Sequence, residues 1–297
     1  MNRILFLGAL AVLVCGCGGR EQTSTPTGPS PPPAPIASGA GPILVGAGDI
    51  ADCSTIGSQL TSQLLDAIAG TVFTAGDNAY PSATEANYRE CYDPTWGRHK
   101  ARTRPVPGNH EYETAGAAPY FDYFGPAAGP RGLGYYSYTV GTWRVLALNS
   151  EIDVGPGSAQ VAWLRSELSS NVRCTAAIWH RPLFSSGSHG DNPDMSAVWR
   201  VLFDFNADVV INGHDHMYER FAPMDADGRS DPARGIREFI VGTGGAAPHA
   251  AARRRANSEV QGADFGVLAL RLADGGYSWT FQGAESGFSD SGSGGCH

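Results

Sequence analysis

Residues 208–216 read DVVINGHDH, an apolar run followed by a glycine, a first histidine, an aspartate and a second histidine. The run 208–211 is short and rich in β-branched residues, which is typical of a buried strand. His214 and His216 are two positions apart, so on an extended segment their side chains face the same way. Two imidazoles presented together after a strand are typical of a metal site. This segment therefore predicts an α/β fold that carries metal ligands at its strand ends.

Four further segments share this pattern, because each joins a metal-binding side chain to the end of an apolar, strand-like run. They are Gly48-Asp49, Gly76-Asp77-Asn78-Ala79-Tyr80, Gly108-Asn109-His110-Glu111 and Trp179-His180. Ligands of an α/β sheet gather at the carboxyl ends of its strands, so we expect the five segments to lie together. A lone Gly-Asp is usually a turn, but five such segments in this order favour a site for two metal ions side by side.

The residue types indicate how two ions would share these segments. Asp77 is the strongest candidate for a bridging ligand, because a carboxylate has two oxygens and can serve both ions. Asp49 would bind one ion, and Asn109 offers a neutral amide oxygen. His180 adds a third imidazole to the pair described above. Imidazole and carboxylate ligands favour zinc, manganese or iron over calcium and magnesium.

The rest of the sequence reads as alternating strands and helices, which is typical of an α/β domain. We expect helices at 58–69, 85–92, 158–168 and 194–205, the third of them capped by Ser158. We expect strands at 43–47, 71–75, 135–140, 143–149, 174–179, 208–211, 236–241, 265–272 and 277–281.

The N-terminus predicts export. Residues 1–3 carry one positive charge and residues 4–14 are almost wholly apolar, which is typical of a signal peptide. Residues 13–17 resemble a bacterial lipobox, with Cys17 as the lipidated residue. We therefore expect a protein anchored by lipid in the bacterial envelope, with plain secretion as the alternative. Residues 18–42 are rich in proline, threonine and glycine and predict an extended linker to a single domain at 43–297.

The net charge and the number of cysteines further limit the class of protein and the compartment in which it works. The 29 acidic and 21 basic residues give a net charge of −8, which argues against a general nucleic-acid binder. The domain at 43–297 holds four cysteines, and an even number in an exported protein favours disulfides. Of three possible pairings we favour Cys53 with Cys91 and Cys174 with Cys296. The second pair would hold a Gly/Ser-rich C-terminal tail that otherwise frays.

The five segments in this order resemble the motifs of the calcineurin-like metallophosphoesterase superfamily, and Tyr80 resembles the tyrosine that separates purple acid phosphatases within it. The resemblance implies an α/β (α+β) fold, a four-layer α/β/β/α sandwich of two mixed sheets. It also implies the ligand sets. The first metal takes Asp49, Asp77, Tyr80 and His216, and the second takes Asp77, Asn109, His180 and His214. A phenolate favours iron(III) at the first site, and the second is expected to hold iron, zinc or manganese.

The resemblance also implies catalytic residues. His110 follows the ligand Asn109, and His189 matches a position where plant members carry a proton-donating histidine. Plant members often have two adjacent histidines there, whereas Gly190 follows in this chain. Arg181 is expected either to position a phosphate or to support its loop. The remaining histidines, His99, His249 and His297, are predicted to be surface residues. The run 253–255 is predicted to be a solvated loop, with contact to anionic lipid or substrate as the alternative.

Three functions follow, in decreasing order of support from the sequence. The first is hydrolysis of phosphate monoesters by metal-bound hydroxide, with a small phosphorylated substrate as the partner. The second is a phosphodiesterase that uses the same metals. The third is a lipoprotein that keeps the fold and binds a ligand without turning it over. The complete set of predicted metal ligands favours an enzyme, and Tyr80 favours the monoesterase.

Overall fold

The computed structural model describes Met1, residues 40–170 and residues 172–297. The predicted signal peptide, the lipidation at Cys17 and most of the predicted linker therefore lie outside the described residues. In the described part of the chain, none of the helices has the length and hydrophobicity needed to cross a bilayer.

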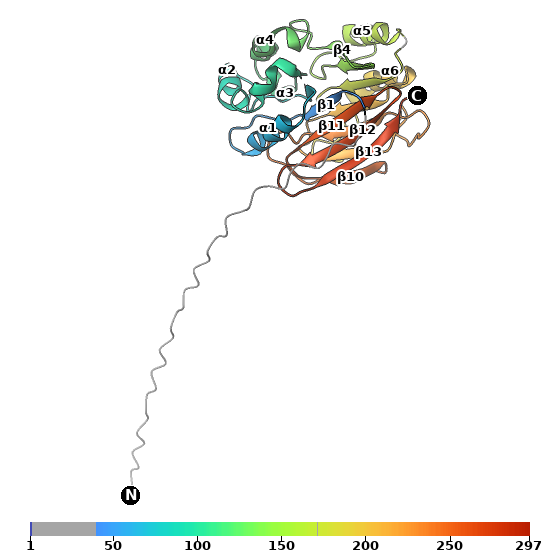
Figure 1. Ribbon diagram of the computed structural model, residues 1–297. Coiled ribbons are helices and arrows are strands. Elements are labelled where there is room, and N and C mark those ends of the chain that lie inside the picture. Colours follow the sequence, from blue (N-terminus) through green and yellow to red (C-terminus); the bar gives the residue numbers. More distant parts are fainter. Residues whose placement is uncertain (2–39, 171) are drawn as a thin grey trace. The chain divides into compact units, whose positions relative to one another are not determined.

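Two sheets form the centre of the domain (Figure 1). The six-stranded sheet has the order β13 (Ser289–Gly295), β12 (Gly276–Gly283), β11 (Gly266–Ala273), β1 (Ile43–Ala47), β2 (Thr71–Thr74) and β3 (Thr103–Arg104). The seven-stranded sheet has the order β10 (Ser258–Gly262), β8 (Tyr218–Phe221), β9 (Arg237–Val241), β7 (Val209–Asn212), β6 (Thr175–Ile178), β5 (Trp143–Ala147) and β4 (Tyr136–Val140). Both sheets are mixed. β1, β2 and β3 are parallel in the first, and β5, β6, β7 and β9 in the second.

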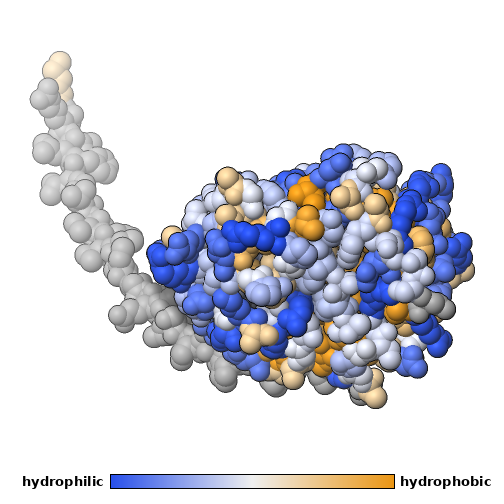
Figure 2. Space-filling model, turned by 90° about the horizontal axis from the view of Figure 1, so that it is seen from above, coloured by the Kyte–Doolittle hydropathy of each residue, from blue (hydrophilic) through white to orange (hydrophobic). Residues whose placement is uncertain are grey.

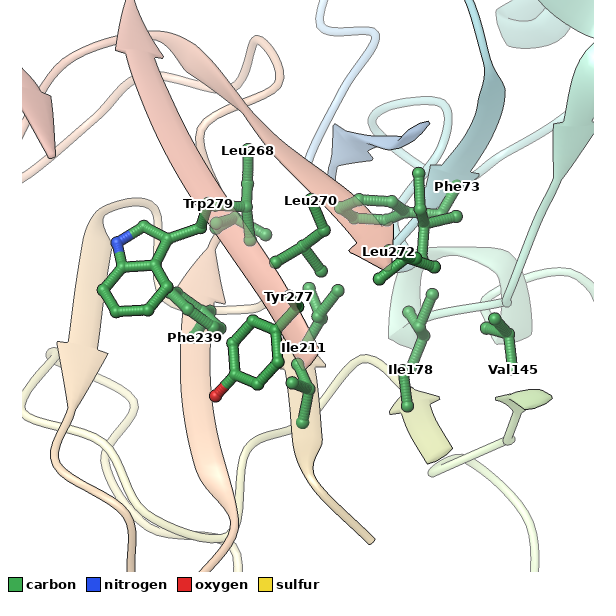
Figure 3. Packing of buried hydrophobic residues seen from close by; sticks show 14 of the residues in the cluster. Phe73, Val145, Ile178, Ile211, Phe239, Leu268, Leu270, Leu272, Tyr277 and Trp279 are labelled. Atoms are coloured by element: carbon green, nitrogen blue, oxygen red, sulfur yellow. The ribbon is translucent and has the colours of Figure 1, made fainter. Parts of the chain in front are cut away.

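The main hydrophobic core lies between the two sheets. Side chains alternate across a strand, so one residue faces the other sheet and the next faces outward. In β1, Leu44 belongs to the cluster between the sheets, whereas Val45 packs on the outer side. Figure 3 shows part of the inner cluster, where side chains of β11 and β12 lie against those of β6, β7 and β9.

Helices cover the outer face of each sheet. On the six-stranded sheet, α1 (Gly57–Ala67) and α4 (Ala118–Phe124) contribute Leu65 and Phe121 to one cluster. On the seven-stranded sheet, α5 (Ala159–Leu168) and α6 (Ser196–Asp204) contribute Leu164 and Trp199 to another. Shorter helices complete the domain: α2 (Glu85–Asn87), η1 (Tyr88–Tyr92), η2 (Trp96–Arg102), α3 (Asn109–Tyr112), η3 (Ala115–Ala117), η4 (Gly125–Ala128) and η5 (Pro193–Met195). This arrangement confirms the expected four-layer sandwich.

The C-terminal tail differs from the prediction of a segment held only by a disulfide. Residues Ser289–Gly295 form β13, which pairs with β12 along its whole length. Its sequence has no apolar residue, so nothing in the pattern predicts a strand. The packing requires glycine at position 292, because a Cβ there would collide with the Trp279 ring. Glycine therefore lets the edge strand lie close over the tryptophan.

Both favoured disulfides are formed. The Cα atoms of Cys53 and Cys91 are 5.3 Å apart, and those of Cys174 and Cys296 are 5.5 Å apart. The first links the loop after β1 to η1, and the second links the residue before β6 to the residue after β13. Structural disulfides are typical of oxidising compartments outside the cytosol.

Hydrophilic residues dominate the face seen in Figure 2, and hydrophobic residues form small separate patches on it. Few large hydrophobic side chains are exposed among the described residues beyond Met1, namely Ile56, Leu133 and Phe205. Such scattered exposure is normal for a protein surface in water.

Candidate metal centre

The predicted ligands lie together at the carboxyl ends of parallel strands from both sheets. Asp49 follows β1 and Asp77 follows β2, both in the six-stranded sheet. His180 follows β6 and His214 follows β7, both in the seven-stranded sheet. The two edges meet, since Nε2 of His180 lies 3.2 Å from Oδ2 of Asp77. The sheets therefore contribute opposite halves of one site.

A first cluster of donor atoms surrounds the phenol of Tyr80. Its oxygen lies 2.9 Å from Oδ1 of Asp49 and 3.2 Å from Oδ2 of Asp77. Nε2 of His216 is also 3.2 Å from the phenol oxygen. These four residues are the set that the sequence assigned to the first metal.

A second cluster surrounds Nε2 of His180. This nitrogen lies 3.2 Å from Oδ2 of Asp77, 3.1 Å from Oδ1 of Asn109 and 3.1 Å from Nδ1 of His214. Oδ2 of Asp77 therefore belongs to both clusters. Two ligands bound to one zinc-like ion at 2.0–2.1 Å are about 3.3 Å apart. The spacing of the donor atoms thus fits two adjacent cations that share Asp77.

Hydrogen bonds orient two of the imidazoles. Nδ1 of His180 donates to the carbonyl of Ala75 at 2.9 Å, and Nδ1 of His216 donates to that of Ala247 at 3.2 Å. A carbonyl only accepts, so the Nδ1 atoms carry the protons. Each Nε2 faces a cluster, and its lone pair would be available to a cation that displaces any proton there, as in a metal-binding histidine.

Two of the predicted ligands are buried carboxylates, and their negative charge favours the binding of cations. Asp49 and Asp77 are buried, with 0% and 1% of their surface exposed. Burial works against ionisation of Asp77, but neighbouring His180 outweighs it and holds the pKa of Asp77 below its usual value. Burial lowers the pKa of His180, yet Asp77 outweighs burial and raises that pKa to about 10. The raised pKa of His180 reflects the carboxylates around it, whereas the lowered pKa of Asp77 reflects the imidazole beside it. A multivalent cation bound here would take over the role of that positive charge.

Ionisation of the Tyr80 phenol depends on such a cation. Burial and the carboxylates of Asp49 and Asp77 raise the pKa of its phenol well above 10. The phenol therefore keeps its proton while these anions face it alone. A cation bound between them would reverse the field and favour the phenolate, which is the form that binds a metal.

The backbone adopts strained conformations at three of the predicted ligands. Asp49, Asp77 and His214 have φ values of 58°, 48° and 72°. Side chains other than glycine rarely occupy this left-handed region, and such residues gather at functional sites. Gly213 allows a close approach here, since a Cβ on it would lie 2.6 Å from Oδ2 of Asp49.

Glu111 is a buried residue of the site to which the sequence assigned no role. Its carboxylate accepts from the backbone N–H of Asn78 at 2.9 Å and of Gly108 at 2.7 Å, and from the hydroxyl of Tyr88 at 3.1 Å. Burial and nearby Asp77 raise the pKa of Glu111 to about 8. The signal for this role was its place three residues after Gly108 at the start of α3, which is the position of the glutamate in a capping box.

The two predicted catalytic histidines lie beside different clusters. The His110 ring packs 4.5 Å from the Tyr80 ring, and its Nε2 is 3.7 Å from Oδ2 of Asp77. The exposed His189 packs 4.3 Å from the ring of His214. Each therefore lies beside a predicted ligand of one cluster.

Two of the histidines predicted to be surface residues are placed differently. His99 is buried, and its Nε2 hydrogen-bonds the carbonyl of Ser62 because η2 packs on α1. His249 stacks on His216, with ring centroids 5.4 Å apart. No ligand or catalytic residue was predicted in its loop after β9, so this position was not anticipated. His297 is exposed as a residue, as predicted, although its ring lies 3.4 Å from Oδ1 of Asp208 and only 20% of its side chain is exposed.

Arg181 supports its loop, which is one of the two roles expected from the sequence, and it also lies beside a predicted ligand. Its Nε lies 3.0 Å from both oxygens of Glu151, and an outer nitrogen lies 3.3 Å from Nε2 of His214. It therefore supports its loop and faces the second cluster. It also lines a cavity of about 690 Å³ together with Asp153 and Asp194.

The fold and the two clusters together are typical of metallophosphoesterases. Residues 43–218 match the calcineurin-like phosphoesterase family, to which this chain belongs. Purple acid phosphatase 23 of Arabidopsis thaliana is 30% identical over 162 residues, covering 47% of this chain and 35% of that protein. The chain spans less than half the length of the curated relatives that it matches.

Solved structures resemble the fold at low sequence identity. Purple acid phosphatase PPD1 from yellow lupin seeds matches with a TM-score of 0.69 and 19% identity, covering 87% of this chain and 55% of that one. GAP50, described as the anchor in the inner membrane complex of Plasmodium, matches with a TM-score of 0.66 and 14% identity, covering 86% and 89%. The fold thus occurs in proteins described in different terms, so function has to be argued from the site.

Proposed function

We propose that the protein hydrolyses phosphate monoesters at a centre of two metal ions. The observation that carries this proposal is the oxygen of Asp77 shared by two clusters of donor atoms, with spacings that fit neighbouring cations. Two cations at this distance would lower the pKa of a bound water and neutralise phosphate oxygens.

The residues around the centre support the remaining parts of the reaction. The leaving alkoxide needs a proton, and His110 and His189 flank the two clusters. Either is suited to hold that proton as a general acid. Arg181, beside His214, presents a guanidinium suited to a phosphate oxygen. The cavity next to it is large enough to hold a small organic leaving group.

The proposed first metal is iron(III), because Tyr80 supplies a hard anionic oxygen, and the second is iron, zinc or manganese. Tyr80→Phe is expected to leave about one of the two metals and to abolish the visible absorption of phenolate-bound iron(III). Elemental analysis and visible spectroscopy measure the two effects. Tyr112→Phe is the control, because that hydroxyl binds Asn149 at 2.7 Å and no cluster atom. A Tyr80→Phe protein with both metals and the visible band would refute the assignment.

We also propose that the protein is exported and anchored to the bacterial envelope through Cys17, with residues 18–42 as the linker and 43–297 as the catalytic domain. The charged and apolar residues at 1–14 support export. The two disulfides support an oxidising compartment. A small phosphorylated molecule is the proposed substrate.

The test compares hydrolysis of an aryl phosphate monoester with that of the matching diester, from acid to neutral pH. We expect strong monoester turnover by the metal-loaded protein and its loss after chelation. A preference for the diester would favour the alternative of a phosphodiesterase. Metal-loaded protein that hydrolyses neither ester would refute the proposal and favour a binding protein without catalysis.

A further inference from the structure

Two loops from distant parts of the sequence are joined by ion pairs and hydrogen bonds beside the centre. Asp191 forms ion pairs with Arg253, at 3.2 Å, and with Arg255. The backbone N–H of Arg253 donates to the carbonyl of Ser186 at 3.1 Å, and that of Arg255 donates to the Ser186 hydroxyl at 3.0 Å. The arginine run therefore joins two loops, while Arg253 and Arg254 remain exposed as the sequence predicted.

This joining of the loops brings His249 next to the proposed metal ligands and next to His189. The backbone N–H of His249 donates to the carbonyl of His216 at 3.0 Å, and the two rings stack. The centroids of the His249 and His189 rings are 6.4 Å apart. One ring nitrogen of each and one carboxylate oxygen of Asp215 all lie within 4.8 Å of one another. Three polar groups therefore converge on one small space.

The described residues leave this imidazole incompletely hydrogen-bonded. Nδ1 of His249 is buried and has no partner among them. Its Nε2 has one long contact, 3.5 Å from the hydroxyl of Ser188. The Asp215 carboxylate is already engaged, because it accepts from the His189 N–H at 2.9 Å and from the Ser185 hydroxyl. Because Nδ1 is closed off from solvent, Nε2 is the nitrogen that is available to a group arriving from outside, and its single long contact leaves it free to donate.

We propose that His249 is a phosphate-binding residue, whose ring N–H donates to an oxygen of the phosphate group held at the metal centre. A neutral imidazole always carries one N–H, so this role needs no change in protonation. With His189, it would form a pair of imidazoles supplied by two different loops. The inference rests on the proposed function, because the phosphate is that of the substrate or product.

The experiment measures binding of inorganic phosphate to the metal-loaded full chain by titration calorimetry. The His249→Ala protein is expected to bind phosphate about tenfold more weakly than the unaltered protein, as loss of one hydrogen bond to an anion predicts. His249→Gln keeps an N–H donor and is expected to recover part of the affinity. His297→Ala is the matched control and should bind like the unaltered protein. Unchanged affinity in His249→Ala and His249→Gln would overturn the proposal.

Metal content, measured on the same samples, separates binding of phosphate from support of His216. We expect two metals in the unaltered protein and in every variant. Loss of one of two metals in His249→Ala would mean that the ring only supports His216. A drop from three to two would mean that His189, Asp215 and His249 hold a metal themselves. Either result overturns the inference.

Turnover of phosphate esters by the unaltered protein is scored in a separate assay. If that protein binds two metals and phosphate but hydrolyses no ester, the proposed function fails and the inference about His249 stands. If it turns over esters and His249→Ala retains its affinity for phosphate, only the inference fails. Should the alanine variant not fold, the comparison of His249→Gln with His249→Leu provides the same test.

Discussion

Asp77→Asn is expected to remove both metals and to reduce phosphate-ester hydrolysis on the order of 10⁴-fold, because the loss of metal catalysis raises the barrier by several kcal/mol. The two clusters meet at one oxygen of this carboxylate. An amide is neutral, so it cannot balance two cations within a buried pocket. Elemental analysis of the purified protein and initial rates with an aryl phosphate monoester measure the two effects.

Asp66→Asn is the matched control for this change. Asp66 has 49% of its side chain exposed and pairs with Arg98 at 2.7 Å, away from the clusters. We expect this variant to keep both metals and full activity, since exposed ion pairs contribute little to stability. An Asp77→Asn protein that retains two metals and normal rates would rule out the proposed bridging role.

Replacing Cys174 and Cys296 together by serine is expected to lower the free energy of unfolding by about 2–5 kcal/mol. The bond closes a span of 122 residues, so its loss frees a long segment of the unfolded chain. It also releases one end of β13, whose exposed and half-buried residues give the strand little burial of its own. Urea unfolding of both proteins under oxidising conditions measures the difference.

The other disulfide provides the comparison. Cys53 and Cys91 are separated by only 38 residues, so their joint replacement is expected to cost about 1 kcal/mol less through the entropy of loop closure. A larger loss from the Cys53 and Cys91 pair, or no loss from the Cys174 and Cys296 pair, would contradict this account.

The elements that the sequence predicted are those whose own residues carry the signal. The apolar run at 43–47 is β1, and the helix expected at 158–168 is α5, capped by Ser158. β13 was missed because its stability comes from pairing with β12 and from the space left for Trp279, and neither is encoded in its composition. Local pattern predicts an element only where burial depends on the side chains of that element.

The same distinction applies to the centre. The predicted ligands stand in short motifs at strand ends, and strand direction alone brings such ends together, so all seven were named in advance. Their role as ligands remains a prediction. His249 was missed because its position depends on Asp191 and Arg253, which are 62 residues apart in the sequence. The sequence of either loop alone therefore does not indicate a contact between residues so far apart.

Each proposed cation takes ligands from both sheets, since Asp49, Asp77, Tyr80 and Asn109 follow strands of one sheet and the three histidines follow strands of the other. The bound ions would therefore link the two sheets and hold them in a fixed position relative to each other. Uptake of metal and alignment of the halves then become a single equilibrium, in which tighter binding raises resistance to unfolding. A substitution that lets the sheets move against each other would therefore weaken metal affinity without changing any ligand. A low concentration of metal in the surroundings would lower the stability of the whole domain.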